Sequence, residues 1–154
     1  MRQRSLILLA GLAAWSCSAQ AMTLERRATF SGHDDGRHGK CTIEVDVDGA
    51  ADIIIRGDQG LLRTLSGEPA VWRRFVCSSP MPMQPQAFRF RGVDGRGSVH
   101  LIRDPRQGGQ AVVRIEDPKR GREGYTFDLE WKGRDINGAD RRYYYDDPSR
   151  PDRW

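Results

Sequence analysis

The chain has 154 residues, with 25 lysines and arginines against 21 acidic residues and a formal net charge of +4. Because the two signs of charge are mixed along the sequence, the composition argues against a nucleic-acid-binding protein. The length suits one domain with a single core, and 17 glycines and 8 prolines between short apolar runs indicate many turns and few helices.

Residues 1–21 have the pattern of a secretory signal peptide. Arg2 and Arg4 precede an apolar stretch that ends in small residues around Ala19 and Ala21, before any acidic residue appears. The apolar stretch is shorter than the ~20 residues that a membrane-spanning helix needs, and no second such stretch follows. Cleavage after Ala21 would remove two arginines and no acid, so the net charge of +4 would fall to +2.

We therefore expect a mature chain that starts at Met22, has no transmembrane segment and resides in the bacterial periplasm or outside the cell. A lipoprotein anchored through Cys17 is the less favoured alternative. Before that cysteine, Ala14 stands where leucine is usual, and the bulky Trp15 stands where a small residue is expected.

Cleavage of the signal leaves two cysteines, Cys41 and Cys77. An even number of cysteines in an exported chain most simply forms a disulfide. A redox or catalytic role would require a Cys-x-x-Cys pair or an activated thiol, and neither pattern is present. The predicted bridge closes a loop of about 36 residues and contributes about 3–4 kcal/mol by chain-entropy reasoning.

The first segments of the mature chain alternate apolar and polar residues, as half-buried strands do. We predict a strand at 24–30, followed by a polar, glycine-rich loop at 31–39. The clearest alternation runs over 41–47, and the segment 51–55 repeats it. These two segments are therefore predicted to be strands of one hairpin.

Burial decides the register of this hairpin. A two-residue turn would pair Val45 with Asp52 and bury the acid. A three-residue turn at 48–50 pairs Val45 with Ile53, puts both apolar sets on one face and leaves Asp52 pointing outward. We predict the three-residue turn.

Two further strands at 61–65 and 71–77 lead into a crossover loop at 78–86, where prolines near both ends exclude ladder hydrogen bonds. Four strand-like runs follow in close succession, and we predict that they form a C-terminal β-meander: 88–91, 99–102, 112–115 and 125–131. Opposite charges on its outer face predict a structural charge ladder. The members of this ladder are Arg89, Arg91, Arg114, Glu116, Asp128 and Glu130.

These patterns predict an all-β fold, a single small antiparallel β-sandwich or compact barrel of about 8–9 short strands. The domain is expected to span 22–133. The segment 134–154 mixes charges with proline and glycine, which is typical of a flexible tail. Its aromatic residues leave open whether the tail docks on the domain or contacts a partner: Tyr143, Tyr144, Tyr145 and Trp154.

One cluster in the sequence has the chemistry of a metal site. Two imidazoles and two carboxylates lie within six residues, and zinc or copper accepts such ligands. The candidate ligands are His33, Asp34, Asp35 and His38. The competing interpretation is a solvated loop, because glycines at 32, 36 and 39 leave the segment without a rigid element.

A second candidate site would bind an anionic ligand. Basic residues gather in the turns of the C-terminal half, where they could line a groove for an acidic polymer such as an envelope polysaccharide. These residues are Arg96, Arg106, Lys119, Arg120 and Arg122.

No pattern in the sequence selects a catalytic set, and we expect no cofactor. We predict an exported, non-catalytic β-sandwich module that binds an envelope protein or an anionic polysaccharide. Two alternatives remain open. The first is a hydrolase whose carboxylates converge across the sandwich, and the second is a metal-binding periplasmic protein that uses the loop from His33 to His38.

Overall fold

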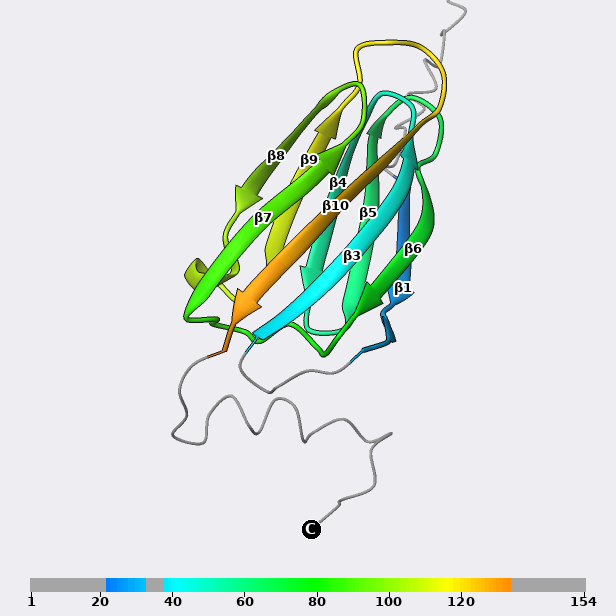
Figure 1. Cartoon of the computed structure of the whole chain (residues 1–154). Helices are drawn as coiled ribbons and strands as arrows, with labels where there is room; N and C mark the ends of the chain where they lie inside the picture. Colours follow the sequence, from blue (N-terminus) through cyan, green and yellow to red (C-terminus); the bar gives the residue numbers. More distant parts are fainter. Residues whose placement is uncertain (1–21, 33–37, 134–154) are drawn as a thin grey trace, which may run out of the picture.

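The computed structural model describes residues 22–32 and 38–133, which form two β-sheets packed face to face (Figure 1). This arrangement confirms the predicted all-β sandwich. The predicted signal peptide, the C-terminal tail and the predicted ligands His33, Asp34 and Asp35 lie outside the described residues. Among the described residues, no helix has the length and apolar character needed to span a membrane.

The described residues contain ten strands and one short 3-10 helix. Their bounds are β1 Thr23–Arg27, β2 Thr29–Phe30, β3 His38–Val47, β4 Ala50–Arg56, β5 Gln59–Ser66, β6 Val71–Cys77, β7 Ala87–Asp94, β8 Ser98–Arg103, η1 Pro105–Gln107, β9 Ala111–Glu116 and β10 Glu123–Lys132. Each of the nine predicted strand segments is found as a strand. The first of them is divided at Ala28 into β1 and β2.

The two sheets have five strands each. Sheet A has the order β1-β5-β4-β9-β8, and sheet B has the order β2-β6-β3-β10-β7. All pairings are antiparallel except that between the short β2 and β6. Because β1 belongs to sheet A and β2 to sheet B, the N-terminal segment bridges both layers along one side. On the other side, β7 and β8 form the free edges (Figure 1).

The predicted hairpin between 41–47 and 51–55 is wrong. β3 pairs with β6 and β10 in sheet B, whereas β4 pairs with β5 and β9 in sheet A. The chain crosses from one sheet to the other at the turn before β4, where Gly49 adopts a φ of 94° that favours glycine. Val45 and Ile53 are therefore both buried, but they belong to opposite layers of the core.

The predicted C-terminal meander is also wrong as a pairing scheme. β8 and β9 do form a hairpin in sheet A, but β7 and β10 lie in sheet B. β10 pairs with β7 along one edge and with β3 along the other. The links before β8 and after β9 therefore cross between the sheets. The sequence does not indicate these crossings, since a strand with one apolar face can bury that face in either layer.

The core lies between the sheets and is built from the alternate, inward-facing residues of each strand. In β3, four such residues are at most 1% exposed, and they are Cys41, Ile43, Val45 and Val47. Aromatic rings fill the wider spaces, with Trp72 stacked on Phe75 at a centroid distance of 5.4 Å. In β3, β9 and β10 the period-two pattern of the sequence is thus realised as burial on one face of the strand.

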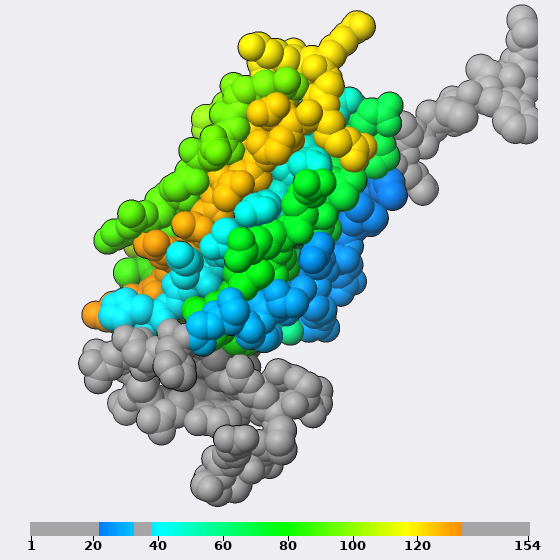
Figure 2. All heavy atoms as spheres, turned by 45° about the vertical axis from the view of Figure 1, so that its right-hand side comes forward, coloured from blue at the N-terminus to red at the C-terminus, as the bar shows by residue number. Residues whose placement is uncertain are grey.

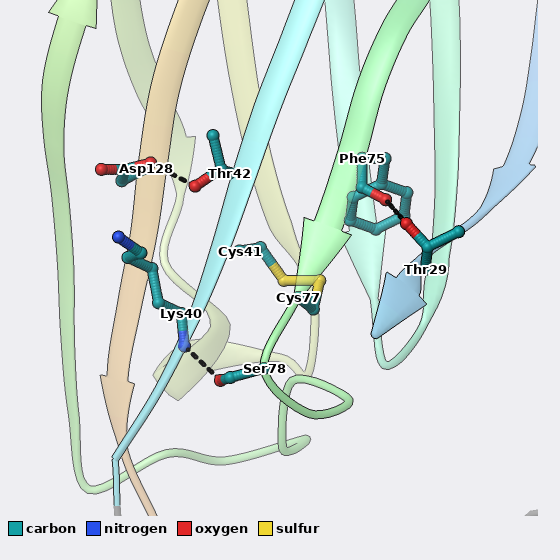
Figure 3. Close-up of a disulfide and its surroundings, with 8 residues drawn as sticks. All are labelled: Thr29, Lys40, Cys41, Thr42, Phe75, Cys77, Ser78 and Asp128. Carbon is teal, nitrogen blue, oxygen red and sulfur yellow. Dashed lines mark hydrogen bonds between the residues drawn. A yellow bond between two sulfur atoms is a disulfide. The ribbon is translucent and has the colours of Figure 1, made fainter. Parts of the chain in front are cut away.

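The predicted disulfide between Cys41 and Cys77 is present, with an S–S distance of 2.03 Å (Figure 3). The two cysteines lie directly opposite each other on β3 and β6, so the bridge joins neighbouring strands of sheet B. Both cysteines are at most 1% exposed. The bridge stabilises the centre of one sheet near the end where β10 finishes.

Candidate functional site

The loops gather at two ends of the sandwich. One end, here called the Arg96 end, holds the links between β3 and β4, β7 and β8, and β9 and β10. The backbone N–H of Asp117 donates to the Gly49 carbonyl there, at 2.7 Å. The opposite end, here called the Trp131 end, holds the end of β10 and the link between β6 and β7, where the Gln86 N–H donates to the Lys132 carbonyl.

At the Arg96 end, the guanidinium of Arg96 is fully occupied by its own chain. Its Nε donates to both carboxylate oxygens of Asp117, at 2.8 and 3.2 Å. Its Nη2 donates to the three consecutive backbone carbonyls at 119–121, and its Nη1 lies 3.5 Å from the Glu123 carboxylate. Arg96 therefore holds the loop after β9 in place, which is a structural task.

The carboxylate of Asp117 is fully buried and belongs to a wider network. Burial opposes its ionisation, but hydrogen bonds from the Lys119 N–H, from Tyr125 and from Arg96 hold the pKa of Asp117 below its usual range. Burial and the contact with Asp117 raise the pKa of Tyr125 to about 12. The Tyr125 hydroxyl also accepts from the Gly97 N–H at 3.0 Å, so the network ties three loops together.

The structure brings four of the five predicted anion-binding residues to the Arg96 end. The Arg122 Nη2 donates to the Pro69 carbonyl at 3.1 Å. Lys119 and Arg120 are exposed and make no side-chain ion pair within the described part of the chain. Their loop projects from this end of the molecule (Figure 2). Arg106 lies apart from the others, on η1, where its Nε donates to Oδ1 of Asp104 at 3.1 Å and its Nη2 donates to Oδ2 at 2.7 Å.

The outer face of sheet A carries a row of charges across its central strands. Asp52 on β4 points away from the core, as predicted, yet it is only 1% exposed. Arg114 on β9 donates two hydrogen bonds to its carboxylate, at 2.8 and 3.0 Å, and Arg63 on β5 adds a third at 3.4 Å. The hydrogen bonds from Arg114 are the main reason why the pKa of Asp52 lies below its usual range.

The outer face of sheet B carries further cross-strand pairs. These are Arg73 with Asp46, Arg74 with Glu44, Arg91 with Glu130, and the hydroxyl of Thr42 with Asp128. The predicted charge ladder is therefore divided between two sheets, because Arg91 and Glu130 pair in sheet B while Arg114 pairs with Asp52 in sheet A. These pairs balance opposite charges across the outer face of sheet B.

A hollow of about 620 Å³ opens at the Trp131 end, beside the first residues of β3 and β7 and the last residues of β10. Its described lining residues are Ser31, Gly32, His38, Gly39, Lys40, Ser78, Ala87, Phe88, Arg89, Glu130, Trp131 and Lys132. The glycine at position 39 explains how the Trp131 ring can form the wall of the hollow that faces the core. Gly39 lies opposite Trp131 in the β3–β10 ladder, and a side chain at Gly39 would collide with the indole ring.

Three cations border this hollow. Lys40, Glu130 and Arg89 lie in one row across β3, β10 and β7, and Lys132 lies two residues further along β10. Among the described residues, none of these three cationic side chains forms an ion pair. The carboxylate of Glu130, which lies between Lys40 and Arg89, pairs instead with Arg91 at 3.5 Å. The described part of the lining therefore carries more basic than acidic side chains.

Hydroxyl groups complete the rim of the hollow. The Ser78 Oγ accepts from the Lys40 N–H at 3.0 Å, and the Ser78 N–H donates to the Lys40 carbonyl at 2.9 Å (Figure 3). In the same view the Lys40 side chain runs from β3 toward the β10 side. Cations and hydroxyls together suit an anionic ligand that also carries polar groups.

Of the predicted metal ligands, His38 lies at the start of β3 and lines this hollow. His33, Asp34 and Asp35 lie outside the described residues, so the metal site stays a prediction. Within the described part of the chain, no group of three or more histidine, cysteine, aspartate or glutamate residues could hold a metal ion.

Sequence reasoning missed the cluster of Lys40, Arg89 and Lys132. The sequence pattern puts Arg89 in the predicted charge ladder, and the two lysines belong to no motif. These residues come together because β10 pairs with both β3 and β7. The β3–β10 pairing joins residues that are far apart in the sequence, such as Thr42 and Asp128, which are separated by 86 positions. Local periodicity does not contain that information.

Comparison of the chain with protein-family models, with curated proteins and with solved structures gives no match. The geometry of the site therefore carries the functional argument alone.

Proposed function

We propose that the protein is an exported, non-catalytic β-sandwich module that binds an anionic partner in the periplasm or outside the cell. The observation that carries this proposal is the hollow at the Trp131 end, where Lys40, Arg89 and Lys132 border one concave surface without an acidic partner among the described residues. Elsewhere on sheet B, charges of opposite sign are paired. An unpaired basic concavity favours an anionic ligand.

Two further observations support export. The first 21 residues have the signal-peptide pattern. The buried disulfide between Cys41 and Cys77 fits an oxidising compartment, because cytosolic reductants keep most thiols reduced. N-terminal sequencing of the mature protein tests the proposed cleavage, and a chain that begins at Met1 would contradict it.

Binding is tested by retention of the purified mature domain on matrices of polygalacturonate, neutral dextran and a cationic polymer. We expect retention on the anionic matrix alone, and we expect it to fall as NaCl rises from 50 to 500 mM, since salt screens exposed charges. Equal retention on neutral dextran, or retention that salt leaves unchanged, would refute an electrostatic binding module.

A hydrolase with paired carboxylates is the second candidate, because Glu116 and Asp117 both line a hollow of about 590 Å³ at the Arg96 end. The carboxylate of Asp117, however, is fully buried and is not available to protonate a substrate in that hollow. Its carboxylate is held by Arg96 and its pKa lies below the usual range, whereas a general acid needs a raised pKa. Hydrolysis of a glycan substrate that is lost in Glu116→Gln would favour this candidate over the binding module.

A metal-binding function remains an alternative proposal that depends on the loop from His33 to His38. It predicts bound zinc or copper in elemental analysis of the tag-free protein, and loss of that metal in His33→Ala. A metal-free protein would remove this alternative.

A further inference from the structure

The hollow at the Trp131 end has a defined arrangement of charge. Lys40 and Arg89 flank the central strand β10, so their backbones stand about 10 Å apart, twice the spacing of neighbouring strands. Lys132 lies two residues beyond Glu130 on β10, about 7 Å along the strand. The three cations thus mark the corners of a triangle rather than a single point.

This spacing favours an extended polyanion over a single small anion. Specific sites for a lone phosphate or sulfate commonly use converging backbone N–H groups at a loop or a helix N-terminus. Here the cations lie on the outward side of regular strands, where the backbone N–H groups of β3 and β10 are used in the sheet ladder. A chain that carries an anionic group on successive units could contact all three.

The uncharged part of the lining favours a sugar chain over a nucleic acid. Sequence-tolerant binding of single-stranded nucleic acids uses exposed aromatic faces on which bases stack. Trp131 is only 4% exposed and Phe88 is half-buried, so neither ring is fully open for a base to stack on. The hydroxyls of Ser31 and Ser78 and the small residues Gly32 and Ala87 instead suit the hydroxyl groups and ring edges of a saccharide.

We infer that this hollow is the binding site for an acidic polysaccharide, whose carboxylates are held by Lys40, Arg89 and Lys132. The inference rests on the proposed function and deepens it, because it assigns the ligand class and places the site on sheet B. It also separates this end from the Arg96 end, where the network around Asp117 uses Arg96 to hold the chain itself.

The chain offers a matched pair of variants for the test. K40Q/R89Q removes one lysine and one arginine from the hollow, and K119Q/R120Q removes one lysine and one arginine from the exposed loop at the Arg96 end. The two variants have the same net charge. Each is compared with the wild-type domain for polygalacturonate binding by isothermal titration calorimetry at 50 mM NaCl, after circular dichroism and thermal unfolding have established an unchanged fold.

We expect K40Q/R89Q to weaken polygalacturonate binding by about 10-fold, and K119Q/R120Q to weaken it by less than about 2-fold. A third variant, K132Q, is expected to weaken binding by about 3-fold and checks the result with a single substitution. Heparin tests whether sulfate replaces carboxylate at the same site, and a single-stranded DNA oligonucleotide tests the competing class of polymer.

Each outcome decides a different point. Equal losses in the two double variants would overturn the hollow as the site while leaving an anion-binding module intact. Wild-type protein that binds no polyanion would overturn the proposed function itself. Binding of the oligonucleotide as tight as that of polygalacturonate, with the same dependence on Lys40 and Arg89, would overturn the assignment to a polysaccharide.

Discussion

Substitution of Asp52 by asparagine tests the charge row on sheet A most directly. The change keeps the size of the side chain, so no cavity forms, but it removes the negative charge that accepts hydrogen bonds from Arg114 and Arg63. Two of these bonds, at 2.8 and 3.0 Å, have good geometry, whereas the bond from Arg63 at 3.4 Å is long.

The expected loss follows from these contacts. Hydrogen bonds to a charged group contribute about 1.5–3 kcal/mol each. Arg114 and Arg63 have side chains that are 38% and 44% exposed, so water can solvate both after the substitution, and the loss must be discounted. We expect Asp52→Asn to lower the free energy of unfolding at pH 7 by about 2 kcal/mol, which shifts the urea midpoint by about 1–2 M.

The pH dependence supplies an independent check. Since the pKa of Asp52 is lower in the folded protein than in the unfolded chain, its stabilising effect is complete above the unfolded pKa of about 3.9 and is lost as the pH falls toward the folded pKa. The stability difference between wild type and Asp52→Asn should stay constant from pH 8 to pH 5 and shrink below about pH 4.

Urea unfolding, followed by tryptophan fluorescence at pH 7, 5, 3 and 2, measures this difference. Other carboxylates titrate in both proteins and cancel in the comparison. Arg114→Gln should cost more than Arg63→Gln, because Arg114 makes the two shorter bonds. A loss below about 0.5 kcal/mol at pH 7, or a difference that stays the same at pH 2, would refute a stabilising ion pair at Asp52.

Removal of the disulfide in Cys41→Ala/Cys77→Ala should cost about 3–4 kcal/mol in urea unfolding, given its sequence separation of 36 residues, and a loss below about 1 kcal/mol would contradict the chain-entropy argument. Gly39→Val should displace the Trp131 ring and cost about 1–3 kcal/mol, with a shifted fluorescence maximum as the readout. Tyr125→Phe should cost about 1–2 kcal/mol, since it removes a buried hydrogen-bonded hydroxyl. In the wild type, the raised pKa of Tyr125 means that the unfolded chain loses this proton first, so stability should fall as the pH rises above about 10, and Tyr125→Phe should lack that part of the fall.

Strand positions could be predicted from the sequence because they depend on local alternation. The segment 41–47 places an apolar residue at every second position, and all four such residues are buried in β3. Likewise, an even number of cysteines in an exported chain was enough to predict the bridge between Cys41 and Cys77. Neither inference required knowledge of which strands are neighbours.

The candidate site could not be predicted, because its members come from strands that are distant in the sequence. Lys40 and Arg89 flank the same strand, β10, only because the links before β4, before β8 and after β9 each cross between the sheets. The prediction of local hairpins kept consecutive strands together. It therefore puts Arg89 and Arg114 on the outer face of one meander, whereas their strands, β7 and β9, lie in different sheets.

The amino-acid sequence by itself determined which residues face the core, since a side chain in a strand alternates sides whatever its neighbours are. Only the tertiary structure decided what surrounds the outward side chains. Asp52 shows the difference. Alternation in the sequence correctly predicts that this acid points away from the core, but only the pairing of β4 with β5 and β9 brings Arg63 and Arg114 beside it, and there Asp52 is 1% exposed. A period-two pattern specifies which face of a strand is buried. Which strands become neighbours depends instead on the free energy of both sheets packed together.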